Sequence, residues 1–96
     1  WRSVLKAGGR LAFGSDAPVE PADPWAGMAA AISRTDAKGE PFGGWLPQET
    51  VSREAALAGF TADAAYAGFA EGRFGRLIPG ERADFLLVDR DPLFAS

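Results

Sequence analysis

The stretch LAFGSD, Leu11 to Asp16, decides which fold the sequence predicts. Its first three residues are apolar on both faces, as in a strand of a parallel sheet, so Arg10–Gly14 is predicted to be a short strand. Ser15 and Asp16 follow the apolar run at once. A carboxylate in this place either caps the next turn or faces a ligand, and the local pattern leaves both possibilities open.

The composition is that of one small globular domain, with 96 residues, 47% apolar and 24% charged. A net charge of −3 gives no basic surface for nucleic acid, and no apolar run is long enough for a membrane span. The lack of cysteine excludes thiolate metal sites and favours a reducing, cytoplasmic setting. The lack of histidine means that metal or acid–base chemistry would need residues from outside this chain.

Capping residues and helical spacing predict several helices. Asp23 is expected to cap a helix from Trp25 to Arg34, with Pro24 at its first position. The other predicted helices end near Ala7, run from the Ser52 cap to Phe60, and run from a Thr61 cap to Phe69.

Two further strands, Arg76–Ile78 and Ala83–Asp89, are predicted to form a hairpin around Pro79-Gly80. The strand at Arg10–Gly14 then lacks neighbours on both sides, and the chain begins with Trp1 rather than methionine. We therefore expect a piece of a longer protein, and we expect this piece to associate with itself through the unpaired edges of Arg10–Gly14.

Two segments carry a resemblance to a known family. LKAGGRLAFGSDAPVEPADPWAGMAAAISR (5–34) resembles the last barrel strand and following loop of the amidohydrolase superfamily, most closely amidohydrolase family 3. SREAALAGFTADAAYAGFAEGRFGRLIPGERADFLLVDRDPL (52–93) is similar to that family's closing helices and re-entrant segment. The order and spacing of the two segments make the resemblance fairly specific.

The resemblance implies an α/β fold class. The chain would comprise the last βα unit of a (β/α)8 barrel, its closing helices and a C-terminal β-hairpin of a small β-sandwich. The expected division is 1–71 for the barrel end and 72–96 for the hairpin. A divalent metal, zinc above all, is also implied. Asp16 stands where the family places an aspartate that is a metal ligand or the catalytic base, while the other ligands lie upstream.

The resemblance therefore implies that the chain is the C-terminal part of a metal-dependent amidohydrolase. This enzyme would hydrolyse the C–N bond of a small-molecule amide, formamide or cyclic amide. The chain alone is expected to be inactive. Two alternatives are a non-catalytic folding or interaction module, and a parent hydrolase of an ester or another bond. Five other acids, Glu20, Asp23, Asp84, Asp89 and Asp91, are interpreted as loop, cap or turn residues. For Glu20 and Asp23 the alternative is a contact with substrate in the parent protein.

Overall fold

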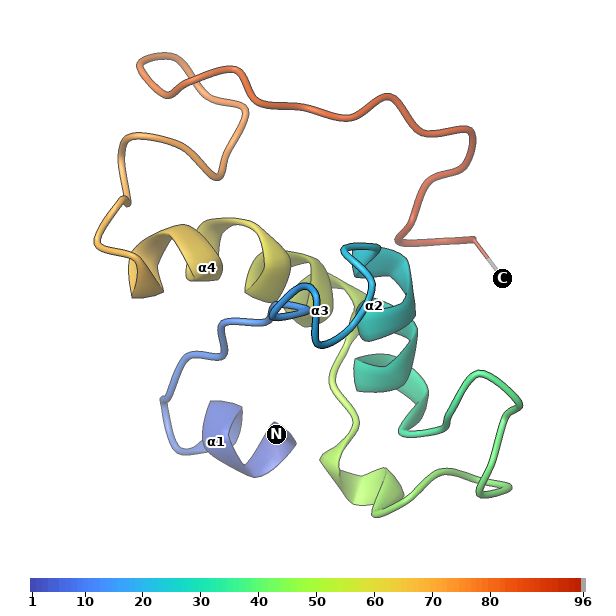
Figure 1. Cartoon of the computed structure of the whole chain (residues 1–96). Helices are drawn as coiled ribbons and strands as arrows, with labels where there is room; N and C mark the ends of the chain where they lie inside the picture. The colour runs from blue at the N-terminus through green and yellow to red at the C-terminus, as the bar shows by residue number, and fades with distance from the viewer. Residues whose placement is uncertain (96) are drawn as a thin grey trace.

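The computed structural model describes residues 1–95, and the regular structure of this part of the chain is entirely helical (Figure 1). Its elements are α1 (Arg2–Lys6), α2 (Pro24–Ser33), the 3-10 helix η1 (Pro47–Glu49), α3 (Arg53–Phe60) and α4 (Ala62–Ala67). Helix α3 packs against both α2 and α4, while α1 lies against η1. The last part of the chain, orange to red in Figure 1, passes over these helices as an arch.

The predicted α/β fold class is wrong, because the described residues contain no β-strand. Residues 10–14 run as a loop, and 76–78 and 83–89 do not pair into a hairpin. A strand is stabilised only when its backbone N–H and C=O groups form hydrogen bonds with a neighbouring strand. Nothing in residues 1–95 lies beside these segments as such a neighbour, so their apolar pattern does not lead to a sheet.

The capping prediction for α2 is confirmed. The Asp23 side chain accepts a hydrogen bond of 2.9 Å from the Trp25 backbone N–H, and Pro24 occupies the first helical position. Arg34 ends the helix in the left-handed region at φ 60°, and its N–H donates to the carbonyl of Ala30. The start of α2 therefore follows from local chemistry, whereas Arg34 at its end also exchanges hydrogen bonds with the backbone of Trp45.

The two helices after residue 50 differ in how they begin. Ser52 caps α3 as predicted, accepting from the Ala55 N–H at 3.1 Å. Thr61 does not cap α4 with its side chain, because its hydroxyl donates back to the carbonyl of Leu57 at 2.8 Å. Helix α4 also ends at Ala67, before the predicted Phe69, which is 90% exposed. The Thr61 cap prediction is thus wrong.

The core is built from small side chains. Met28 and Ala31 of α2 meet Val51 and Ala56, and each of these four residues is at most 7% exposed. Partly buried apolar side chains surround this cluster; they are Leu5, Leu11, Phe13, Ile32, Ala55, Leu57 and Phe60. Alanines let the helices approach closely, so that the core is tight but small.

Phe13 attaches the 10–14 loop to α3. Its backbone N–H donates to the carbonyl of Gly59 at 2.8 Å, and its ring lies against the Gly59 backbone. The Phe13 ring centroid is 5.7 Å from that of Phe60 and 5.7 Å from that of Trp1. Phe13 and Leu11 are half-buried and pack against the core. The predicted self-association through residues 10–14 stays a prediction.

Glu49 connects η1 to the first residues of the chain. Its carboxylate accepts hydrogen bonds from the Trp1 amino group and from both the hydroxyl and the backbone N–H of Ser3. These donors lower the pKa of Glu49 to about 2. Helix α1 is thereby held against η1 by a charged contact as well as by Leu5 in the core.

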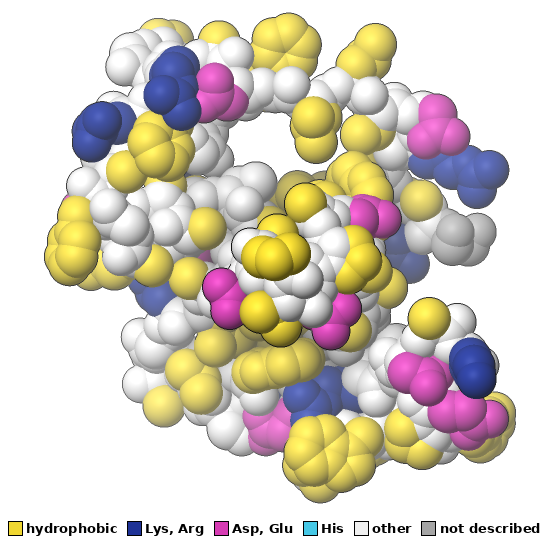
Figure 2. Space-filling model, in the orientation of Figure 1, with side chains coloured by type: hydrophobic (Ala, Val, Ile, Leu, Met, Phe, Trp, Pro, Cys, Tyr) yellow, Lys and Arg dark blue, Asp and Glu magenta, His cyan; other side chains and the backbone are white. Residues whose placement is uncertain are grey.

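The arch, which we define as Arg82–Pro92, is attached at its two ends. At one end the Arg82 N–H donates to the Arg73 carbonyl at 2.8 Å. At the other, the Arg53 guanidinium donates to the carbonyls of Pro92 and Ala95. Figure 2 shows apolar side chains along the arch at the top of the view, open to solvent.

No helix in the described residues is both long and apolar enough to cross a membrane.

Candidate functional site

Asp16 lies at the start of a tight turn between the 10–14 loop and α2. Its carbonyl accepts a hydrogen bond of 2.9 Å from the Val19 N–H, and the Ala17-Pro18 peptide bond in this turn is cis. The backbone of Asp16 is left-handed, with φ 51°, a conformation that aspartate and asparagine adopt more readily than most residues. The turn therefore sets the direction of the Asp16 side chain.

The Asp16 carboxylate is exposed and has no hydrogen-bond or ion-pair partner among residues 1–95. Other aspartates of the chain use their side chains locally. Asp23 caps α2, Asp36 accepts from the N–H groups of Lys38 and Glu40, and Asp91 accepts from Leu93. The Asp16 side chain therefore caps no backbone N–H group among residues 1–95, and its role stays a prediction.

The neighbours of Asp16 do not form a catalytic constellation with it. Ser15 is half-buried, and its carbonyl accepts from the Glu20 N–H at 3.3 Å. A serine nucleophile needs an adjacent base, and Ser15 has no such partner in the described part of the chain. The predicted structural role of Asp84 is consistent with its 2.6 Å contact to Arg82.

A metal ion would find only part of a site here. The described residues contain no group of three or more acidic side chains close enough together to hold one. The free oxygens of Asp16 suit a divalent cation as one ligand, but a zinc site takes three or four protein ligands. The described residues therefore contain no complete site of this kind, and the role of Asp16 as a metal ligand stays a prediction.

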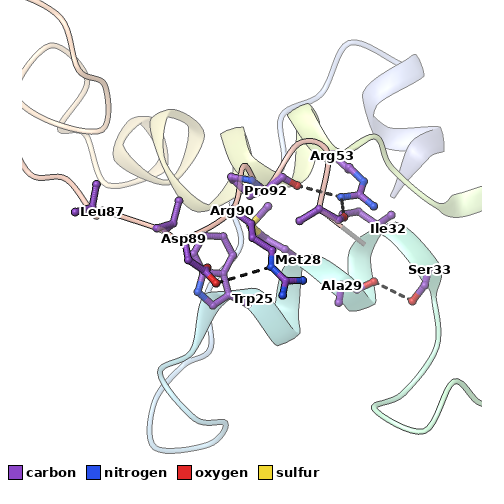
Figure 3. Close-up of a pocket in the computed structure, with 12 residues that line it drawn as sticks. Trp25, Met28, Ala29, Ile32, Ser33, Arg53, Leu87, Asp89, Arg90 and Pro92 are labelled. Carbon is purple, nitrogen blue, oxygen red and sulfur yellow. Dashed lines mark hydrogen bonds and ion pairs between the residues drawn. The ribbon is translucent and has the colours of Figure 1, made fainter.

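Two clefts lie between the arch and the helices. One cleft of about 760 Å³ opens between α2, α3 and the arch (Figure 3). Its lining includes Trp25, Met28, Ile32, Arg53, Leu87 and Arg90. Figure 3 shows the Asp89–Arg90 ion pair, at 3.8 Å, beside Trp25. The lining is mostly apolar.

Sequence reasoning found one wall of this cleft and missed the other. The helical spacing of Trp25, Met28 and Ile32, which can be read from the sequence, places them on one face of α2, and all three line the cleft. Arg53 was missed because its partners, Pro92 and Ala95, lie about 40 residues further along the chain. No local pattern indicates a contact over that separation.

Comparison with known proteins connects these observations to a family. A family model described as "Amidohydrolase family" matches residues 1–95. The N-substituted formamide deformylase of Arthrobacter pascens is 35% identical over 92 residues, which are 96% of this chain and 16% of that protein. Protein LONG AFTER FAR-RED 3 of Arabidopsis thaliana is 35% identical over 88 residues, 92% of this chain and 15% of that protein.

The chain thus spans only about a sixth of the length of the curated relatives it matches. No solved structure matches it.

Proposed function

Because this chain belongs to the amidohydrolase family, we propose that it is part of a cytoplasmic, metal-dependent hydrolase that cleaves the C–N bond of an amide, a formamide or a cyclic amide. The observation that supports a role for this chain is the Asp16 carboxylate, which is exposed and unpaired within residues 1–95 at the start of a tight turn. A carboxylate that serves no local hydrogen bond is available to a ligand.

In this proposal Asp16 is the base of the reaction. Its carboxylate takes a proton from the attacking water while the water oxygen bonds to the carbonyl carbon. The C–N bond then breaks, and Asp16 returns the proton to the departing nitrogen, so that an acid and an amine are released. A divalent metal such as zinc, held mainly by ligands outside this chain, would supply Lewis-acid polarisation of the carbonyl.

The turn gives Asp16 a fixed backbone and a side chain that is free of hydrogen bonds, and a base in this reaction needs both. The hydrogen bond from Val19 to the Asp16 carbonyl and the half-buried Phe13 three residues earlier hold the backbone on both sides. The side chain is left free to move a proton, because none of the described residues engages its oxygens. The 96 residues alone provide one ligand at most, so we expect no hydrolysis by them without the rest of the site.

Among substrates, a formamide is the first choice. The Arthrobacter pascens relative, named an N-substituted formamide deformylase, shares 35% identity with nearly the whole of this chain. The rival classes are an ester hydrolase and a module without catalysis. A substrate panel of N-substituted formamides, cyclic amides and esters separates them, since only the proposed enzyme releases amine.

The decisive variant is Asp16→Asn in the protein that carries this chain with its remaining metal ligands. Asparagine is nearly isosteric and tolerates the left-handed backbone at φ 51°, so the turn should survive. It cannot accept the proton, and we expect kcat for amine release to fall by about 10²–10⁴-fold. The thermal midpoint should stay within a shift equivalent to about 0.5 kcal/mol.

The matched control is Asp23→Asn, seven residues along the same loop. Asparagine caps a helix about as well as aspartate, so both fold and rate should be kept. If Asp16→Asn keeps its rate within about threefold, as expected for a residue that transfers no proton, Asp16 is structural and this assignment is wrong. If the unaltered protein releases amine from no substrate of the panel, the proposed activity is wrong.

A further inference from the structure

Gly59 leaves room for the Phe13 ring on the face of α3. A Cβ atom added at Gly59 would lie 2.9 Å from Cε2 and 3.2 Å from Cγ of Phe13, closer than ordinary van der Waals contact. Glycine weakens a helix relative to alanine, and the backbone of Gly59 is not left-handed, so the helix itself has no need of glycine here. The space that this glycine leaves is therefore needed for Phe13.

The Phe13 ring has two aromatic neighbours besides α3. Its centroid lies 5.7 Å from those of Phe60 and Trp1, and the Phe13 backbone N–H donates to the Gly59 carbonyl at 2.8 Å. The Cγ atom that a new Cβ would meet is at the root of the side chain, next to the backbone. A ring packed in this way cannot swing aside from its root, so a side chain at Gly59 must displace the Phe13 backbone.

A displacement of Phe13 carries over to Asp16. Only two residues separate them in the chain. The turn that follows is closed by two hydrogen bonds, from the Val19 N–H to the Asp16 carbonyl at 2.9 Å and from the Glu20 N–H to the Ser15 carbonyl at 3.3 Å. A turn closed in this way moves as a unit, and its carboxylate moves with it.

We infer that Gly59 and Phe13 are positioning residues for the base Asp16, so that helix α3 determines where its carboxylate stands. The inference rests on the proposed role of Asp16 and adds a requirement that this role alone does not contain. Neither positioning residue takes part in the reaction. A general base must lie within hydrogen-bond reach of the proton that it accepts, and a misplacement of about 1 Å lowers a rate by about 10²-fold.

The test begins with Gly59→Ala in the protein that carries this chain with its remaining metal ligands. Amine release from an N-substituted formamide is the assay. We expect kcat to fall by about 10- to 100-fold, because the base is displaced, while KM stays within about twofold, because substrate binding does not depend on the base. Circular dichroism at the assay temperature checks that the variant is folded.

The matched control is Gly27→Ala, on the neighbouring helix α2. A Cβ there would lie 2.7 Å from Cζ of Phe60, which is the far tip of a ring and can swing aside. This substitution also crowds the contact between α2 and α3, but it does not press on the segment that holds Asp16. Its kcat should therefore stay within about threefold of the unaltered protein.

A second substitution tests the contact from the other side. Phe13→Leu keeps an apolar anchor with a smaller and more adaptable side chain, and by itself it should lower kcat by about threefold or more because the anchor is looser. Added to Gly59→Ala, it makes room for the new methyl group. The double variant should then be faster than Gly59→Ala alone by about threefold or more, whereas two independent losses of stability would make it slower.

The outcomes separate this inference from the proposed function. The inference is overturned if Gly59→Ala and Gly27→Ala have equal kcat, or if the double variant is no faster than Gly59→Ala, while Asp16→Asn still lowers the rate. If Gly59→Ala does not fold, an unchanged kcat for Phe13→Leu overturns it. A rate that Asp16→Asn does not lower removes the base itself, and the proposed function then fails as well.

Discussion

The helices and the arch use apolar residues in opposite ways. In the helical part most of the buried residues are small, with Ala56 at 0% and Ala31 at 1% exposure beside the longer Met28. In the arch the apolar residues are large and exposed to solvent, with Phe85 at 70% and Leu87 at 97% exposure. By side chain alone the arch has more to gain from burial. The comparison teaches that burial depends on whether the backbone can be satisfied in place, and not on hydrophobicity alone.

The backbone explains the difference. A helix satisfies many of its backbone N–H and C=O groups within itself, so α2 and α3 need a neighbour only for the apolar face that they carry. An extended segment needs a neighbour for the same groups. Ala56 is buried because α3 lies against α2, whereas Leu87 remains exposed because no described segment pairs with it.

The largest expected effect comes from placing a charge in each region. Ala56→Asp puts an unpaired carboxylate into the core and should destabilise the fold by about 3–5 kcal/mol, a large part of the total stability of a small domain. Leu87→Asp places the same charge in solvent. It should change the free energy of unfolding by about 0.5 kcal/mol or less when measured at concentrations too low for association.

Urea denaturation monitored by circular dichroism measures both variants. If the two substitutions lower the free energy of unfolding equally, the helical part is not the stable unit of this chain, and the two regions do not differ as argued.

A smaller effect tests the contact of the 10–14 loop with α3. A Cβ added at Gly59 would lie 2.4 Å from Cδ2 of Phe13, which is too close, so the ring must move. We expect Gly59→Ala to destabilise by about 1–2 kcal/mol, because overpacking of about 1–3 kcal/mol exceeds the gain in helix propensity. Thermal unfolding followed by calorimetry gives the value.

Gly14→Ala is the control, since a Cβ there meets nothing within 4 Å. It should shift stability by about 0.5 kcal/mol or less. A stabilised Gly59→Ala would mean that Phe13 does not rest on α3, and that the 10–14 loop is as free as the arch.

The smallest expected effect is a dependence on pH at the other end of the helical part. The pKa of Glu49 falls from its ordinary 4.5 to about 2 because of the Trp1 amino group and Ser3. A lowered carboxyl pKa stabilises the folded state fully above about 4.5, and this contribution is lost as the pH falls toward 2. Glu49→Gln should therefore lower the thermal midpoint near neutral pH, with the difference shrinking toward pH 2.

The control for this effect is Glu20→Gln, which changes an exposed glutamate in the loop before α2. It should leave the midpoint near neutral pH unchanged. A Glu49→Gln difference that persists undiminished at the acid end would mean that its charge does not hold α1 against η1.

The candidate site was accessible to sequence reasoning only in part. Asp16 was singled out by its place after an apolar run and by the family resemblance, and its role stays a prediction. The left-handed backbone and the cis bond before Pro18 were not foreseen, since each depends on the whole turn. The proposed division of the chain after residue 71 likewise stays a prediction.

What the sequence by itself determined is the set of elements that satisfy their own backbones: α2 with its Asp23 cap, α3 with its Ser52 cap, and the end of α1 near Ala7. Capping and helical spacing act over a few residues, so they can be read locally. Only the tertiary structure decided that Phe13 packs on Gly59, whereas the apolar side chains of the arch stay exposed. Both segments look like strands, and whether such a segment finds a partner depends on residues distant in sequence.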